Sequence, residues 1–349
     1  MEEARRAPSQ VAARQVMDEL PEPGTVRQVA PGVLWVRMPL PFALNHINVW
    51  LLEDGDGWTI VDTGIGSSRT KDHWERIFRE SLGDKPVVRV IATHFHPDHV
   101  GLAGWLVDRW KAEFCASLTE WLFGRMLSLE SPEAMVRTSL AFYRRAGLDE
   151  AALAVMAERG NSYARGVVPL PARLRRLKAG DRLPIGGADW HVITGGGHTP
   201  EHVCLHCPDR SLFIAGDQVL PRISPNISVW ASEPDADPLD DFLRTLDRLR
   251  SLPDDLLVLP SHDTPFTGLH ARLDALAAHH RERLDEVVKA CAEPSTVAEV
   301  TRVMFNRPLD PHQLVFAVGE ALAHLNHLAI RDRLVRRADS DGLLRFSRA

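Results

Sequence analysis

Short runs of apolar residues separated by polar turns dominate the chain after a polar N-terminal stretch. Runs at 33–36, 47–52 and 58–61 are rich in Val, Ile and Trp, as strands are. The Asp-Gly pairs between the second and third runs predict a hairpin. Residues 69–82 predict a helix, and 86–92 form an apolar run rich in β-branched residues, typical of a buried parallel strand.

A helical pattern interrupts these strands at about 117–160. Ser117 with Glu120 has the spacing of a capping box, and Pro132 and Asp149 suit the first positions of two further helices. We therefore expect an insertion of about three helices, which could lie over an active site.

Strands return after the insertion, followed by an amphipathic helix at 239–252 and a buried strand at 256–260. Strands alternating with helices predict an α/β fold with a layered αββα architecture. Beyond residue 280 a second capping box (Thr296 with Glu299) opens a helix, and another helix and a hairpin follow. This order predicts a small winged-helix-like domain.

The predicted organisation has three parts. Residues 1–25 form a loosely ordered or helical arm, 26–280 form the catalytic domain with its insertion, and 281–349 form the winged-helix-like domain. The pattern shows neither an internal repeat nor a low-complexity tract.

Composition excludes several classes of protein. The 349 residues are 44% hydrophobic and 25% charged, which is ordinary for a globular chain and unlike collagen or a disordered protein. With 41 Lys and Arg against 47 Asp and Glu, the net charge of −6 argues against a protein that coats nucleic acid or anionic lipid. Four cysteines do not make a disulfide scaffold. We see no signal-like segment or membrane span, and we expect a cytoplasmic protein.

The chain has 16 histidines, and one group of them indicates chemistry. His94, His96, Asp98 and His99 lie within six residues, directly after the β-branched run. His94 and His96 can point to one side of an extended loop, while Asp98 and His99, beyond a proline turn, can face a second point. Imidazole and carboxylate ligands suit Zn, and also Fe, Mn or Co.

Further motifs lie on both sides of this group. Asp62 ends a strand in Val-Asp-Thr-Gly upstream, and downstream His198 lies in Gly-His-Thr-Pro, Asp217 in Ala-Gly-Asp and His262 in Pro-Ser-His. The motifs and their order resemble those of the metallo-β-lactamase superfamily. The resemblance covers roughly residues 26–280 and implies the four-layer αββα sandwich of that superfamily.

The resemblance implies a site for two divalent metal ions, with Zn²⁺ as the first expectation and Fe or Mn as alternatives. One ion would be held by His94, His96 and His198, the other by Asp98, His99 and His262, with Asp217 bridging both and Asp62 supporting the ligand loop from outside. A hydroxide bridging the metals would attack the substrate. Asp98 would be the catalytic residue that orients the nucleophile and accepts its proton.

The predicted function is hydrolysis of an ester, thioester or lactone of a small molecule. The alternative is a phosphodiesterase or RNA endonuclease, because some relatives with a similar C-terminal extension cut RNA, and nucleic acid would then be the partner. The lack of an export signal argues against a β-lactamase proper, and the complete ligand set argues against a binding module without activity. A homodimer stays open.

Five further positions are expected to lie outside the metal-binding set. His202 is expected to be a structural or outer group and not a seventh ligand, and His46 could reach the mouth of the site. Cys204 and Cys207 are expected to pack in the core. Asp263 stands where many relatives have glycine after the last histidine.

Overall fold

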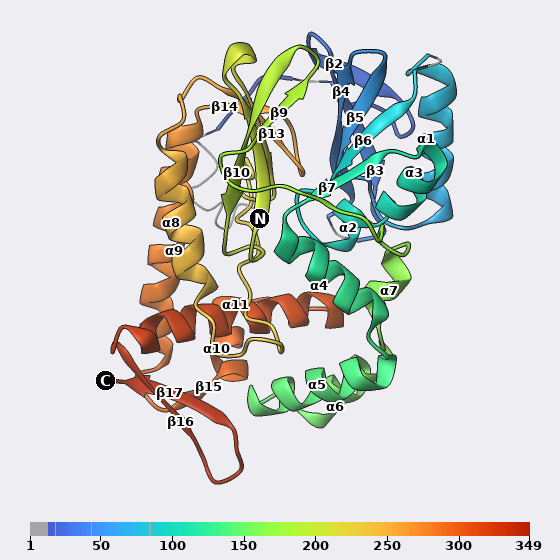
Figure 1. Ribbon diagram of the computed structural model, residues 1–349. Helices are drawn as coiled ribbons and strands as arrows, with labels where there is room; N and C mark the ends of the chain where they lie inside the picture. The colour runs from blue at the N-terminus through green and yellow to red at the C-terminus, as the bar shows by residue number, and fades with distance from the viewer. Residues whose placement is uncertain (1–12, 18, 43, 84) are drawn as a thin grey trace.

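Two seven-stranded sheets packed face to face form the centre of the structure, a computed structural model that describes residues 13–349 apart from 18, 43 and 84 (Figure 1). Helices cover the outer face of each sheet, so the architecture is the predicted αββα sandwich. The predicted arm, residues 1–25, falls partly outside the described residues. Its described part contains a short strand and not a helix.

The first sheet holds the N-terminal strands. Its order is β2 (Val26–Ala30), β3 (Val33–Pro39), β4 (His46–Asp54), β5 (Gly57–Val61), β6 (Val87–Ile91), β7 (Glu113–Ala116) and β8 (Arg175–Arg176). β4 and β5 form the predicted hairpin, and β6 is parallel to both its neighbours. The β-branched run therefore lies between parallel strands, as its composition predicts, with Val87, Val90 and Ile91 buried and Val88 exposed.

The second sheet combines the chain after the insertion with one N-terminal strand. Its order is β1 (Arg14–Gln15), β14 (Phe266–Thr267), β13 (Leu257–Pro260), β12 (Leu212–Gly216), β11 (His202–Cys207), β10 (Ala188–Gly195) and β9 (Arg182–Ile185). β12 and β13 are parallel, so their carboxyl ends meet at one edge.

The core has one layer between the sheets and one outside each sheet. Trp35, Trp50 and Trp190 are fully buried between the sheets. Burial of each side chain removes ~150–250 Å² of its surface from contact with water. α1 (Ser68–Glu80) and α3 (Ala103–Trp110) cover the first sheet, and α8 (Pro238–Leu249) and α9 (Leu269–Ala290) cover the second.

The insertion contains the expected helices and a short fourth one: α4 (Leu118–Leu129), α5 (Pro132–Arg145), α6 (Glu150–Glu158) and α7 (Ser162–Gly166). Ser117, Ser131 and Asp149 each accept a backbone hydrogen bond as N-caps. Glu120 does not complete a capping box, because its carboxylate binds elsewhere.

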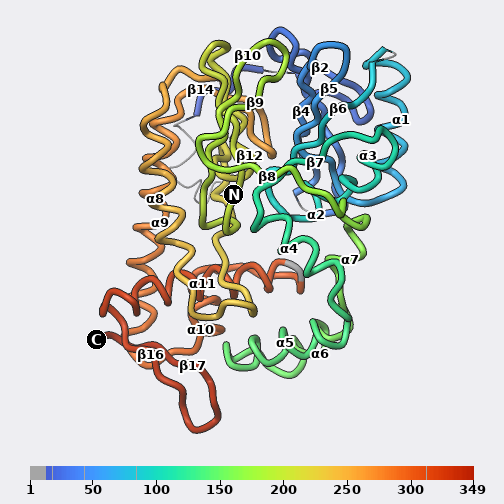
Figure 2. Tube along the Cα trace, in the orientation of Figure 1, coloured from blue at the N-terminus to red at the C-terminus, as the bar shows by residue number. Residues whose placement is uncertain are grey.

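The C-terminal part consists of β15 (Ser295–Thr296), α10 (Val297–Met304), α11 (Pro311–Ile330) and the hairpin of β16 (Leu334–Ala338) and β17 (Leu344–Arg348). The capping box of Thr296 and Glu299 is present. The predicted domain boundary at 280 lies inside the continuous helix α9, and the winged-helix comparison stays an interpretation of the element order. In Figures 1 and 2, α11 crosses beneath the lower ends of both sheets.

Among the described residues, no helix combines the length and the apolar character needed to cross a membrane.

Candidate metal centre

The seven predicted ligand residues come together at the edge where strands of both sheets end. β6 leads into the loop of His94 and His96 and into the short helix α2 (Pro97–Val100), which carries Asp98 and His99. Asp217 directly follows β12, His262 closely follows β13, and His198 lies between β10 and β11. Strand ends thus position every one of these side chains.

Three imidazoles and one carboxylate form the first cluster. His96 Nδ1 lies 2.9 Å from His94 Nε2 and 3.1 Å from His198 Nε2. Asp217 Oδ2 lies 3.3 Å from His198 Nε2. One ligand atom from each of these four residues lies within 4.8 Å of the others, a spacing that suits a single cation.

Asp98, His99 and His262 form the second cluster beside it. Asp98 Oδ2 is 3.6 Å from the Nε2 atoms of both histidines. The other oxygen of Asp217, Oδ1, is 3.4 Å from His262 Nε2 and 3.6 Å from His99 Nε2. Asp217 therefore presents one oxygen to each cluster, as a bridging ligand does.

The far sides of the rings determine which nitrogen is free to bind a cation. The Nδ1 atoms of three histidines lie 2.8 Å from acceptor oxygens: His99 from Asp62 Oδ2, His198 from the Asn226 carbonyl and His262 from the His46 carbonyl. A carbonyl cannot donate, so the proton belongs on Nδ1 and the lone pair on Nε2 faces the cluster. His99 Nε2 and Asp217 Oδ1 are buried without a hydrogen-bond partner. The arrangement fits two divalent cations.

Burial and mutual charge set the protonation of the cluster. Burial, reinforced by the neighbouring histidines, lowers the pKa values of His94 and His96 well below the ordinary range. Burial would raise the pKa of Asp217, but His262 and His99 hold it well below its usual value. Neutral imidazoles at His94 and His96 and an ionised Asp217 are the forms that bind metals. Burial would also lower the pKa values of His99 and His262, but the facing carboxylates raise them.

Asp62 joins the end of β5 to the ligand loop. Its Oδ1 accepts the Thr93 backbone N–H at 2.8 Å, and its Oδ2 faces His99. Asp62 has a φ of +63°, a left-handed conformation that Asp tolerates better than most residues. Its carboxylate therefore orients a ligand histidine without itself lying in either cluster.

The insertion holds the peptide between His94 and His96 from two sides, which sequence reasoning missed. Glu120 Oε2 accepts the Phe95 N–H at 3.0 Å, and Tyr163 Oη donates to the Phe95 carbonyl at 2.6 Å. Glu120 Oε1 also accepts the Glu201 N–H at 2.7 Å, beside the His198 loop. Glu120 is 2% exposed, and burial raises its pKa to about 7. Its spacing from Ser117 suggested a helix cap and concealed this role.

His202 supports the bridging carboxylate from behind. Its Nε2 accepts the Asp217 backbone N–H at 3.1 Å, and its ring stacks on His94 with centroids 4.8 Å apart. Gly216 has a φ of +56°, and a Cβ there would lie 2.3 Å from His202 Cε1. Only glycine fits both the backbone and the close approach.

His46 and Asp263 hold the loop of the last histidine. The Asp263 N–H donates to His46 Nε2 at 2.8 Å, while the His46 carbonyl accepts from His262. Asp263 has a φ of +71°, which explains why glycine suits this position, and its carboxylate pairs with Arg222 at 3.0 Å. His46 thus acts behind the ligand.

Aromatic side chains line one side of the first cluster. The Trp230 ring lies 6.5 Å from that of His96 and 6.1 Å from Phe316 of α11, and Phe95 stacks on Phe123 of α4 at 5.6 Å. The insertion and the C-terminal part therefore both bring apolar surface near the clusters.

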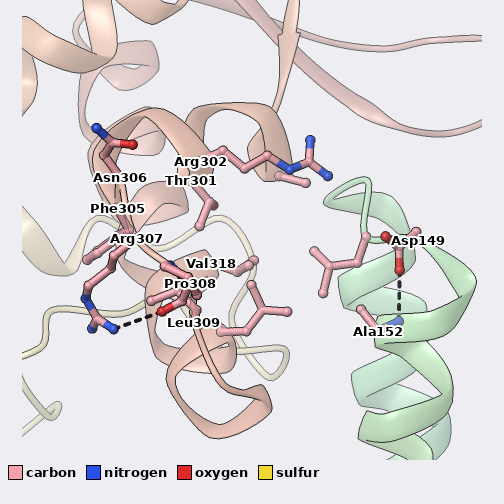
Figure 3. Close-up of a pocket in the computed structure, with 13 residues that line it drawn as sticks. Asp149, Ala152, Thr301, Arg302, Phe305, Asn306, Arg307, Pro308, Leu309 and Val318 are labelled. Carbon is pink, nitrogen blue, oxygen red and sulfur yellow. Dashed lines mark hydrogen bonds between the residues drawn. The ribbon is translucent and has the colours of Figure 1, made fainter.

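A separate hollow of about 540 Å³ lies between the insertion and the C-terminal part (Figure 3). Asp149 and Ala152 line one side, and Thr301, Phe305 and Val318 lie across from them. None of the seven ligand residues lines this hollow, so it is distinct from the metal clusters.

Comparison with known proteins settles the family. Residues 43–262 match the Metallo-beta-lactamase superfamily, and residues 284–349 match the family described as Metallo-beta-lactamase-like, C-terminal domain. The chain belongs to the metallo-beta-lactamase superfamily. The predicted family and αββα fold are thereby confirmed, and with them the prediction of an enzyme of the hydrolase class.

Relatives within the superfamily match most of the chain. A crystal structure of a beta-lactamase domain protein from Burkholderia ambifaria is 45% identical, has a TM-score of 0.92, and is matched over 98% of this chain and 100% of that one. The probable metallo-hydrolase YqjP of Bacillus subtilis is 23% identical over 86% of this chain and 93% of its own. The human acyl-coenzyme A thioesterase MBLAC2 is 24% identical over 73% and 85%.

Proposed function

We propose that this protein is a dinuclear metal hydrolase that cleaves a small acyl thioester, ester or lactone. The observation that carries the proposal is the pair of clusters sharing Asp217, with lone pairs and buried unpaired atoms directed at two points. His94, His96 and His198 would hold one ion and Asp98, His99 and His262 the other. Zn²⁺ is the proposed metal, with Fe or Mn as alternatives, because imidazole and carboxylate ligands suit all three.

Bound divalent ions would lower the pKa of water towards neutrality and polarise the substrate carbonyl. The chain's own contribution is orientation and proton handling. The Asp98 side chain keeps 19% exposure, against 9% for Asp217, and its Oδ2 faces both histidines of its cluster. Asp98 is therefore the proposed group that orients the attacking water and accepts its proton.

The surroundings support an acyl group as the substrate's apolar part. Trp230 and Phe316 form a partly exposed aromatic pair beside His96, and aromatic walls suit acyl chains better than phosphate backbones. The human relative MBLAC2 is named as an acyl-coenzyme A thioesterase, which agrees with this choice.

Nucleic acid is the less favoured substrate. Two of the arginines after α11, which could contact phosphates, are engaged with carboxylates: Arg331 pairs with Asp237 at 2.6 Å, and Arg336 pairs with Asp235 at 2.6 Å. The cytoplasmic location and a homodimer stay predictions.

The test is turnover by the metal-loaded protein of acyl-CoA thioesters of increasing chain length, of lactones and of carboxylic esters, with single-stranded RNA as the competing arm. We expect thiol release from the thioesters, and a loss of about 10²–10⁴-fold in kcat for Asp98→Asn. RNA cleavage without any acyl turnover would overturn the proposal.

A further inference from the structure

The C-terminal part touches the segment that supports the metal ligand His198. Residues 218–229 connect the bridging Asp217 to the chain before α8, and the Asn226 carbonyl in this segment accepts the His198 Nδ1 proton at 2.8 Å. The position of that carbonyl therefore decides where His198 Nε2 points.

Helix α11 holds this segment by side-chain and backbone hydrogen bonds. Asn226 Nδ2 donates to Glu320 Oε2 at 3.1 Å, and Ser228 Oγ donates to Asn226 Oδ1 at 2.5 Å. The Val229 N–H donates to the Gly319 carbonyl at 3.1 Å. Both polar atoms of the Asn226 amide are thus engaged.

The contact between α11 and this segment is close. A Cβ on Gly319 would lie 2.8 Å from Ser228 Oγ and 3.0 Å from the Val229 carbonyl oxygen. Only a residue without a side chain permits this approach, so the backbone of α11 lies directly against the segment.

The segment is also held by α9. The buried Arg272 side chain donates to the carbonyls of Leu220 and Ile223, at 2.5 Å and 2.7 Å. The two helices therefore shape the segment along its length, and α11 is the one that reaches Asn226.

The two faces of α11 have different neighbours. The Phe316 carbonyl and the Glu320 carboxylate, one turn apart, contact the segment, while Leu314 and Val318 line the hollow of Figure 3 on the opposite face. The helix is therefore packed between the insertion and the metal-supporting segment, and a helix so placed is a rigid support.

We propose that α11 is part of the metal centre's framework, and that Glu320 is a positioning residue that fixes His198 through Asn226. The proposal rests on the metal-binding part of the proposed function and not on its substrate. It gives the C-terminal part a role in metal affinity.

The test compares Glu320→Ala, which removes the nearer of two acceptors of Asn226 Nδ2 and leaves the Phe316 carbonyl at 3.4 Å, with Glu320→Gln, whose amide oxygen can still accept. Gln313→Ala is the matched control, because Gln313 lies in the first turn of α11 and contacts Arg307 and Asp310 instead of the segment. Metal affinity is measured by competition with a chromophoric chelator, and the His198 Nδ1–H exchange rate by NMR on the metal-free chain.

We expect Glu320→Ala to lower the affinity for one of the two metal ions by about 10-fold, which is the lower end of the effect of removing a hydrogen-bond partner of a metal ligand. The His198 Nδ1 proton should also exchange faster. Glu320→Gln and Gln313→Ala should stay within about 2-fold of the parent chain. Unchanged affinity and exchange in Glu320→Ala, or an equal loss in Gln313→Ala, would overturn the proposal.

The readouts separate this inference from the proposed function. If the parent chain binds two metals but hydrolyses no acyl substrate, the substrate assignment fails and the role of Glu320 is still judged by affinity. If the parent chain binds no metal, the proposed function fails, and faster His198 exchange in Glu320→Ala alone still decides the positioning role.

Discussion

Replacing Tyr163 with Phe removes one hydroxyl from the support of the ligand loop and leaves the ring in place. The hydroxyl donates to the Phe95 carbonyl at 2.6 Å, between His94 and His96. Tyr163 is 9% exposed, so water cannot readily replace the lost bond. A buried carbonyl left without its donor costs about 1–3 kcal/mol. We expect Tyr163→Phe to lose about 1–2 kcal/mol of unfolding free energy.

The matched control is Tyr143→Phe, which alters the other of the chain's two tyrosines. Tyr143 also lies in the insertion and is 7% exposed, but it packs in the cluster beneath the second sheet. We expect a loss below about 0.5 kcal/mol there.

Urea unfolding of metal-free and metal-loaded protein measures both variants. Because Tyr163 holds a ligand loop, Tyr163→Phe should lose more unfolding free energy in the metal-loaded protein than in the metal-free protein. The metal affinity of this variant should fall as well. Equal losses in the two tyrosine variants, or a Tyr163→Phe loss that is the same with and without metal, would refute the reasoning.

Three further predictions concern other supports of the site. Glu120→Gln removes a buried charge but turns an NH₂ group towards a backbone N–H, so the two effects should nearly cancel in the unfolding free energy. Competition with a chelator should nevertheless show about 10-fold weaker metal binding, and an unchanged metal affinity would contradict this prediction. Gly216→Ala should cost more than Gly55→Ala in urea unfolding, because both have positive φ but only Gly216 meets His202, whereas Gly55 has nothing within 4 Å; equal costs would disprove the steric argument. Burial opposes ionisation of Asp237, yet hydrogen bonds from a histidine and an arginine of the C-terminal part lower its pKa from 3.8 to about 2. The resulting stabilisation is present above pH 4 and is lost as the pH falls through 2, so Asp237→Asn should lose about 1–2 kcal/mol of unfolding free energy at pH 7 and less towards pH 2. A difference in unfolding free energy that does not change with pH would refute this prediction.

The elements of the sandwich could be predicted from the sequence because their signals are local, and the seven candidate ligands because their motifs stand in the order found in the metallo-β-lactamase superfamily. A β-branched run indicates a buried parallel strand whatever its place in the chain, and the polar residues that follow it lie at the carboxyl end of that strand. His94 and Asp217 follow β6 and β12 in this way. The hairpin of β4 and β5 is equally local, since its turn residues lie between its strands.

Apart from Asp62 and His202, the supports of the ligands could not be predicted, because they depend on contacts between residues far apart in the chain. Glu120 has the spacing of a helix cap, yet its carboxylate binds Glu201, 81 residues away. Asn226 and Glu320, 94 residues apart, carry no motif that links them. The identity and order of ligand residues are properties of sequence, whereas a buried hydrogen bond exists only where the packing of helices and sheets brings donor and acceptor together.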